Sequence, residues 1–376
     1  MQTSDTPTQR GLAEFPWDAM APYAKVAASH EGGAIDLSVG SPVDATPKVV
    51  TEALAAAADA HRYPLTAGTA ELRSAIAAWY RRRRGVTVAE DAVLPTIGSK
   101  ELVALLPLLL GLGPGDAVVF PQIAYPTYAV GAQLVGAEAL ALDNPADWPQ
   151  HTKLVWLNSP SNPDGRVLDI DALREAVVRA RELGAVIVSD ECYAELGWEG
   201  PWRSTPIPSV LDPRIMQNDH TGVLATYSLS KQSNLAGYRA AFVAGDPSLI
   251  ARLLAVRKHA GLIVAAPVQA AKVAALGDDA HVEAQKQRYG ARREVLLRGL
   301  RAAGFQVDDS IAGLYLWATL HEDAWQTIAA LAQHGILAGP GHIYGEQSRQ
   351  HVRFALTASD ADIAEAARRL EAFRAS

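Results

Sequence analysis

The amino-acid sequence predicts an α/β protein with a large domain, built on a mostly parallel sheet between helices, and a smaller α+β domain. In the first two thirds of the chain, helical periods alternate with short apolar runs bounded by Gly, Pro, Asp or Asn, as is typical of buried parallel strands. Beyond about residue 247 the pattern changes to long helices followed by short strands. The length of 376 residues also exceeds what one compact core usually carries.

The elements follow from these periods in chain order. Helices are expected over 47–61, 69–84 and 99–110, strands at 117–120, 153–157, 185–189, 222–227 and 240–244, and a crossover helix over 171–183. After them come helical stretches at 248–276 and 281–303, strands at 304–308 and 314–318, a helix at 324–333, and a last strand and helix from residue 351. Residues 1–10 look like a loose tail.

These elements predict three segments. Residues 1–36 form an N-terminal segment that joins the small domain, residues 37–247 form the large domain, and residues 248–376 form a linking helix and the C-terminal small domain.

Composition and charge exclude several classes of protein. The net charge of −7 argues against a nucleic-acid or anionic-membrane partner. The longest apolar stretch, 102–113, contains Pro107 and is too short to span a bilayer. The N-terminal stretch lacks the apolar core of a signal peptide. Cys192 is the single cysteine, which excludes a disulfide framework and fits a reducing cytoplasm. The histidines lack ligand spacing, so we expect no metal site.

Three of these features have an ordinary structural interpretation. Cys192 fits a small buried filler. The basic run 81–84 fits a solvated helix end, and Arg257 and Lys258 fit surface charges on a helix.

Polar segments follow three of the predicted strands. Residues 158–165 follow the strand at 153–157, residues 190–193 follow 185–189, and residues 228–231 follow 222–227. Ligands of open α/β sheets bind beyond the carboxyl ends of the strands. Lys231, directly after a buried strand, either pairs with a charge or has a lowered pKa suited to imine chemistry, or else extends to water. Gly98 precedes a helix whose first N–H groups could bind an anion.

The order of the motifs from Gly40 to Arg353 resembles the fold-type I, class I/II aminotransferases, which use pyridoxal 5′-phosphate. Within that family, several stretches resemble the actinobacterial N-succinyldiaminopimelate aminotransferases. They read FPWD, LSVGSPVD, YPLTAGTAELR, IGSKELVALLP, AYPTY, LNSPSNPDGRVL, VSDECYAELGW, SLSKQSNLAGYRA, VRKHAG and AGLYLWAT.

The resemblance implies a role for each matching residue at the reactive end of the cofactor. Lys231 would form an imine with the cofactor and shuttle a proton. Asp190 would pair with the pyridine nitrogen, and Asn162 and Tyr193 would hydrogen-bond the ring oxygen O3′.

The remaining roles concern the phosphate, the ring face and the substrate. The resemblance implies that Tyr125 stacks on the ring and that Tyr63 reaches the phosphate in the partner subunit of a homodimer. It implies that Arg353 clamps the substrate α-carboxylate, which Gly40 and Asn162 adjoin. The phosphate would be bound by Ser99, Lys100, Ser228, Ser230 and Arg239.

Two departures from the family pattern bear on specificity. Asp164 replaces the threonine usual in the N-P-T-G turn, where aspartate also serves. The sequence shows no clear arginine for a side-chain carboxylate, which weakens an aspartate-specific interpretation.

We therefore expect a cytoplasmic aminotransferase that runs a ping-pong cycle between glutamate/2-oxoglutarate and N-succinyl-2-amino-6-ketopimelate/N-succinyl-LL-2,6-diaminopimelate. Alternatives with the same cofactor are an aspartate, aromatic or N-acetyl-diaminopimelate aminotransferase, or a β-lyase. A non-enzymatic alternative is the ligand-sensing half of a transcription regulator, which would carry an N-terminal basic helix-turn-helix.

Overall fold

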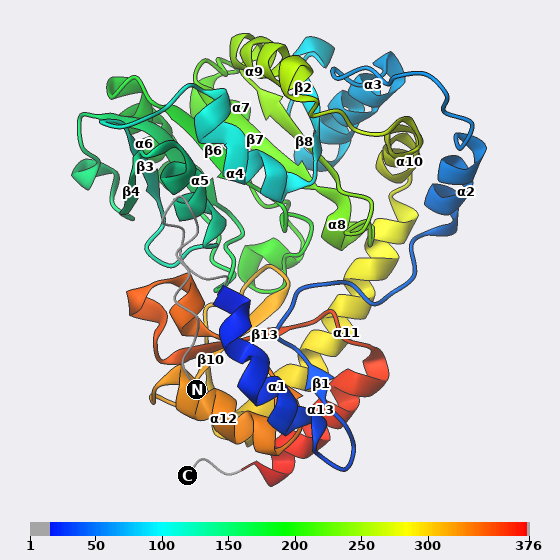
Figure 1. The fold of residues 1–376 in the computed structure, drawn as a ribbon, viewed down its shortest axis with the longest axis vertical. Helices are drawn as coiled ribbons and strands as arrows, with labels where there is room; N and C mark the ends of the chain where they lie inside the picture. Colours follow the sequence, from blue (N-terminus) through cyan, green and yellow to red (C-terminus); the bar gives the residue numbers. More distant parts are fainter. Residues whose placement is uncertain (1–15, 374–376) are drawn as a thin grey trace.

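A seven-stranded sheet lies at the centre of the larger lobe of the computed structural model, which describes residues 16–373 (Figure 1). The strand order is β2-β8-β7-β6-β5-β3-β4. β8 runs antiparallel to both its neighbours, and the other pairs are parallel, as the sequence predicts. The strands are β2 (Val93–Ile97), β3 (Ala117–Phe120), β4 (Glu138–Ala141), β5 (Thr152–Asn158), β6 (Val186–Asp190), β7 (Val223–Ser228) and β8 (Ala240–Gly245). The tail expected at 1–10 lies outside the described residues.

Helices cover both faces of this sheet (Figure 1), because successive side chains of each strand point to opposite faces. On one face Tyr227 and Phe242 pack with Trp79, whose ring lies 4.4 Å from that of Tyr227. On the other face Trp156 stacks on Tyr128 at 5.1 Å. The helices of this lobe are α2 (Lys48–Ala56), α3 (Ala70–Trp79), α4 (Ser99–Leu109), α5 (Thr127–Val135), α6 (Ile170–Glu182), α7 (Pro213–Met216), α8 (Leu229–Gln232), α9 (Pro247–Ala260) and α10 (Ala266–Gly277).

The smaller lobe contains an antiparallel sheet of four strands in the order β12-β13-β10-β9. Besides the two hydrophobic cores on the faces of the larger sheet, a third core lies between this smaller sheet and the helices around it. The elements are β9 (Gln306–Asp308), β10 (Tyr315–Thr319), β12 (Gly339–Pro340), β13 (His351–Ala355), α11 (Ala280–Ala302), α12 (Ala324–Gln333) and α13 (Asp360–Ala372). The long helix α11 runs from the larger lobe into the smaller one (Figure 1).

The N-terminal segment packs on the smaller lobe. β1 (Ile35–Asp36) pairs in parallel with β11 (Ile336–Leu337). From α1 (Ala21–Ala28), Tyr23 stacks on Trp325 at 5.3 Å. α9 and α10 contribute side chains to the cores around the larger sheet. The domain boundaries at 36 and 247 stay a prediction.

Short turns complete the chain between these elements. A π-helical turn (Tyr80–Arg84) extends α3, and 3₁₀ turns occur at Pro16–Met20, Glu90–Ala92, Pro145–Asp147, Gly200–Arg203, Gly341–Tyr344 and Glu346–Ser348. Within residues 16–373, no helix has both the length and the apolar character needed to cross a bilayer.

One expectation about basic residues is wrong in part and another is wrong. In the run expected to be solvated, Arg81 and Arg82 are exposed, but Arg84 is 5% exposed and lies 3.4 Å from Glu191. Arg257 is fully buried and forms a two-pronged ion pair with Glu101, at 2.7 and 3.0 Å. In both cases a carboxylate distant in sequence compensates the buried charge. Lys258, in contrast, is exposed as expected.

Candidate active site

A cavity of about 300 Å³ lies beyond the carboxyl ends of β5, β6 and β7, where the loop after β1 and strands β10 and β13 of the smaller lobe meet the larger lobe. Except for Tyr63, every site residue expected from the sequence lines it. These residues are Gly40, Ser99, Lys100, Tyr125, Asn162, Asp190, Tyr193, Ser228, Ser230, Lys231, Arg239 and Arg353. Tyr63 lies elsewhere in the described chain, in the loop between α2 and α3, with 99% of its surface exposed.

Lys231 reaches the cavity from the short helix that directly follows β7. Its Nζ donates a hydrogen bond to the carbonyl oxygen of Gly40. Burial, together with the positive charges of Arg353 and Arg239, lowers the pKa of Lys231. This amine is therefore deprotonated at lower pH than an ordinary lysine, which suits a nucleophile or a general base.

Asp190 is the last residue of β6 and is 7% exposed. Its carboxylate accepts hydrogen bonds from the Cys192 N–H and the Tyr128 hydroxyl, both at 3.2 Å. Burial raises the pKa of Asp190, and these hydrogen bonds partly oppose the rise. A buried carboxylate at a cavity wall is suited to pair with a cationic ring nitrogen.

A cluster of anion-binding groups lies at the start of α4. Gly98 precedes the helix at φ 75°, and a Cβ there would collide with the Arg239 guanidinium. The Ser228 and Ser230 hydroxyls, which also line the cavity, lie 2.8 Å apart. A helix N-terminus, two hydroxyls and a guanidinium together fit a phosphate.

Arg353 forms the opposite end of the cavity. It is 3% exposed, donates to Asn162 Oδ1 at 2.8 Å and to the Ser38 carbonyl at 2.6 Å, and lies over the Tyr315 ring at 3.9 Å. Its Nε is buried without a hydrogen-bond partner in the described chain. A guanidinium with unused donor capacity in a polar cavity fits a carboxylate ligand.

Several aromatic residues complete the site, and none of them was assigned a role from the sequence. The Tyr315 and Tyr193 hydroxyls lie 3.2 Å apart. Although burial opposes it, the positive charges of Arg353 and Lys231 lower the pKa of Tyr315. The other three are Trp17, Tyr128 and Tyr344. Trp17 and Tyr315 lie within the motifs FPWD and AGLYLWAT. The sequence therefore marked both residues as part of a family motif, but no role was inferred for them.

Two smaller expectations are also resolved. Cys192 is buried, at 8% exposed, as expected, but it also lines the cavity, and burial raises the pKa of its thiol. Asp164 keeps the tight turn, because its carboxylate accepts from the Arg166 N–H at 3.2 Å. Burial raises the pKa of Asp164.

The cavity therefore offers complementary groups for each part of pyridoxal 5′-phosphate and of an amino acid. The Lys231 amine would suit the aldehyde, the buried Asp190 carboxylate the ring nitrogen, the α4 cluster the phosphate, and Arg353 a carboxylate. The residues present fit the cofactor expected from the sequence.

Comparisons with known proteins agree with this chemistry. The family described as aminotransferase class I and II matches residues 33–370. The chain is 56% identical to the 4-dedimethylamino-4-oxo-anhydrotetracycline transaminase OxyQ of Streptomyces rimosus, over 96% of this chain and 99% of that protein. It is 55% identical to the probable aminotransferase Rv1178 of Mycobacterium tuberculosis, over 96% and 85% of the two chains.

Among solved structures, the N-succinyldiaminopimelate aminotransferase of Mycobacterium tuberculosis aligns with a TM-score of 0.83 at 27% identity, covering 94% of this chain and 98% of that one. The probable N-succinyldiaminopimelate aminotransferase of Thermus thermophilus gives 0.85 at 28%, covering 95% and 100%.

Proposed function

Because this chain belongs to the class I and II aminotransferases, we propose that the cavity around Lys231 is its active site and that it transfers an amino group from glutamate to a keto acid. Members of this family use pyridoxal 5′-phosphate. The observation that carries the proposal is that Lys231, Asp190 and Arg353 come from distant parts of the sequence and line one cavity.

The residues of the cavity would hold the cofactor at several points. Asp190 would pair with the pyridine nitrogen, and Asn162 and Tyr193 would hydrogen-bond O3′. Tyr125 would pack on the ring. The phosphate would be bound by Ser99, Lys100, Ser228, Ser230 and Arg239. When bound, the cofactor supplies the aldehyde that accepts the amino group and a ring that withdraws electrons from the substrate Cα.

Lys231 would bind the cofactor and then move a proton at the substrate Cα. Burial lowers the pKa of Lys231, which favours the neutral amine relative to an ordinary lysine, and a neutral amine can take that proton and return it. The small helix that follows β7 fixes the lysine beside the cofactor site.

Arg353 would bind the α-carboxylate of either substrate with two parallel hydrogen bonds. A Cβ at position 40 would collide with the Tyr315 hydroxyl, so glycine is needed for the backbone to lie close to that hydroxyl. The substrate would therefore lie between Arg353 and the lysine.

For the amino acceptor we propose N-succinyl-2-amino-6-ketopimelate, the keto acid of N-succinyl-LL-2,6-diaminopimelate. In support, the two similar structures carry that substrate in their names, and an LL-diaminopimelate aminotransferase of Gloeobacter violaceus is 33% identical over 90% of the chain. Among the described residues that line the cavity, the arginines are Arg239 and Arg353. The proposal assigns Arg239 to the phosphate and Arg353 to the α-carboxylate.

A second candidate acceptor is a polycyclic ketone such as the one named for OxyQ. The 56% identity over 96% of the chain favours it. The two acceptors differ in charge and flatness, so they can be distinguished with purified substrates.

We also propose that the protein is a cytoplasmic homodimer in which Tyr63 reaches the partner's phosphate site. The exposed side chains of Tyr63 and Leu65, 99% and 63% exposed, support a surface that a second copy covers.

The proposed acceptor is tested by comparing kcat/KM for two reactions. Purified enzyme is supplied with N-succinyl-LL-2,6-diaminopimelate and 2-oxoglutarate, and glutamate is measured; in parallel, the anhydrotetracycline ketone is supplied with glutamate. We expect the first reaction to be faster. A faster second reaction would favour the polycyclic ketone as the amino acceptor. Release of a β-substituent from a β-substituted amino acid, with no amino acceptor present, would support a β-lyase.

A further inference from the structure

Three side chains donate hydrogen bonds to the backbone carbonyls of the loop from Ser38 to Gly40. The Ser38 carbonyl accepts a hydrogen bond from Arg353 at 2.6 Å, the Val39 carbonyl from Thr357 at 3.0 Å, and the Gly40 carbonyl from Lys231. Two of these three donors are cations that the proposed function assigns to the substrate or the cofactor. When those cations bind their ligands, the loop loses part of its support.

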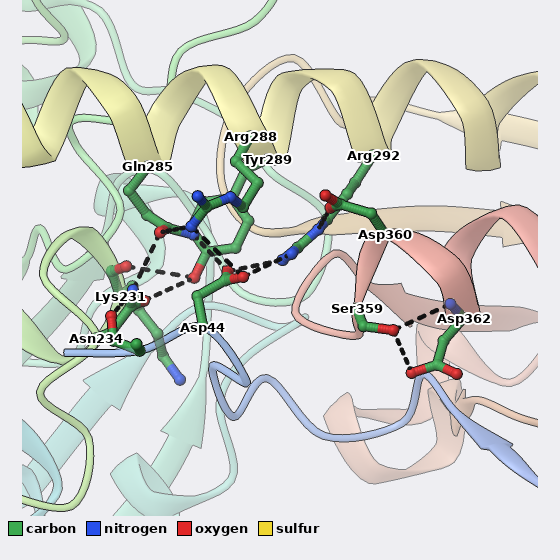
Figure 2. A network of polar contacts seen from close by, with 11 residues as sticks. Asp44, Lys231, Asn234, Gln285, Arg288, Tyr289, Arg292, Ser359, Asp360 and Asp362 are labelled. Carbon is green, nitrogen blue, oxygen red and sulfur yellow. Dashed lines mark hydrogen bonds and ion pairs between the residues drawn. The ribbon is translucent and has the colours of Figure 1, made fainter. Parts of the chain in front are cut away.

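The segment between β1 and α2, which contains this loop, has a second anchor at Asp44 that is independent of those cations. The Asp44 carboxylate accepts from Arg292 Nη1 at 2.8 Å and Nη2 at 2.7 Å, and from Gln285 Nε2 at 2.8 Å (Figure 2). Arg288 lies 3.5 Å from the same carboxylate. The side chains of Asp44 and Arg292 are only 10% and 3% exposed. A two-pronged, largely buried pair of this kind is geometrically specific.

The helix that holds Asp44 also contacts the segment of Lys231. The Tyr289 hydroxyl lies 3.4 Å from the Lys231 carbonyl, and Gln285 Oε1 accepts from Asn234 at 3.0 Å (Figure 2). α11 therefore contacts both the segment that carries Gly40, through Asp44, and the segment that carries Lys231.

We propose that Asp44 is a positioning residue, whose ion pair with Arg292 on α11 keeps the Gly40 loop opposite Lys231 when Arg353 and Lys231 bind their ligands. The inference rests on the proposed function, because it takes the cavity as the place where glutamate binds. Asp44 itself does not line the cavity. It acts through the backbone of Gly40, beside which the substrate carboxylate would bind.

The chain offers a matched control. Arg292 has a second carboxylate partner, Asp360 on α13, at 2.6 Å from Nε. That side chain is 73% exposed and belongs to the smaller lobe, away from the glycine loop. Asp44→Asn and Asp360→Asn each neutralise one carboxylate that pairs with Arg292. Only Asp44→Asn weakens the contact between Arg292 and the segment that carries Gly40.

The experiment measures the reaction of holoenzyme with glutamate over a range of glutamate concentrations, together with calorimetric binding of glutarate, an unreactive dicarboxylate. In Asp44→Asn we expect roughly a tenfold higher glutamate concentration at half-maximal rate, a limiting rate changed less than that, and weaker glutarate binding. In Asp360→Asn all three quantities should equal those of the wild type.

Arg292→Lys is the second variant, in case Asp44→Asn does not fold. It keeps the charge but loses the two-pronged contact, so glutamate and glutarate affinity should again fall. Equal affinities in wild type, Asp44→Asn and Arg292→Lys would overturn the inference alone. A wild-type holoenzyme that does not respond to glutamate would instead contradict the proposed function.

Discussion

Arg353 and Asn162 lie 191 residues apart in the sequence, yet Arg353 Nη1 donates a 2.8 Å hydrogen bond to Asn162 Oδ1. Asn162 follows β5 of the larger sheet, and Arg353 lies in β13 of the smaller one. This contact joins the two lobes at the cavity. The proposed carboxylate clamp therefore depends on how the lobes are packed together.

Replacement of Lys231 should abolish turnover. Without the amine there is no residue to bind the cofactor covalently or to move the Cα proton, and loss of the proton transfer alone reduces a rate by about 10²–10⁴-fold. Absorption spectra and glutamate turnover of Lys231→Ala measure this. Lys258→Ala, at an exposed position on α9, is the control and should keep both. A Lys231→Ala protein with normal turnover would remove the lysine from the mechanism.

Arg353→Lys should weaken the binding of both substrates. Lysine cannot form two parallel hydrogen bonds to a carboxylate, and it leaves the Tyr315 ring without its planar neighbour at 3.9 Å. We expect KM for glutamate to rise roughly tenfold or more. Arg349→Lys, whose guanidinium is half exposed beside Glu346, is the control. An unchanged KM in Arg353→Lys would argue against the clamp.

Tyr315→Phe tests a residue that the sequence did not single out. The substitution removes the hydroxyl 3.2 Å from that of Tyr193, and the loss of such a bond typically costs about 0.5–1.5 kcal/mol. We expect kcat/KM to fall several-fold. Tyr344→Phe is a matched control, because the Tyr344 hydroxyl is buried without a partner in the part of the chain described here. Equal kinetics for the two variants would exclude a role for the Tyr193–Tyr315 pair.

Lys272 should make the stability of the protein depend on pH. It is fully buried, its Nζ donates to the Ala241 carbonyl at 2.6 Å, and burial, with the nearby charge of Arg257, lowers its pKa to about 7. Between that value and the ordinary lysine pKa, the unfolded chain binds more protons than the folded one, so this group makes stability rise with pH. Below pH 7 its penalty is constant and largest.

The variant Lys272→Met removes this dependence. The free energy of unfolding of Lys272→Met should exceed that of wild type by the largest amount at and below about pH 7. This excess should shrink as the pH approaches 10. Urea unfolding of both proteins at several pH values measures the difference. A difference that is the same at every pH would show that Lys272 does not titrate in this range.

Much of the fold is predictable from local patterns, and the two missed strands of the seven-stranded sheet show where such patterns fail. β2 (Val93–Ile97) contains Pro95, which normally argues against a strand. The structure accommodates it because β2 is an edge strand, paired only with β8. β4 (Glu138–Ala141) is the other edge, and its two exposed and two half-buried residues carry no clear alternation.

That most residues of the candidate site would line one cavity was predictable, because they follow strands in ordered motifs. What could not be predicted depends on partners far away in the sequence. Arg257 looked like a surface charge, and only the folded chain places Glu101 beside it. Tyr315 belongs to a strand of ordinary apolar pattern, and its role depends on Tyr193, Arg353 and the shape of the glycine loop.

The most direct test of the central claim is an absorption spectrum of the purified protein with pyridoxal 5′-phosphate, titrated with glutamate. We expect a visible band in wild type that glutamate bleaches as 2-oxoglutarate is released, and no such band in Lys231→Ala. A wild-type protein that shows no band after addition of the cofactor, or a band that glutamate leaves unchanged, would contradict an aminotransferase that works through Lys231.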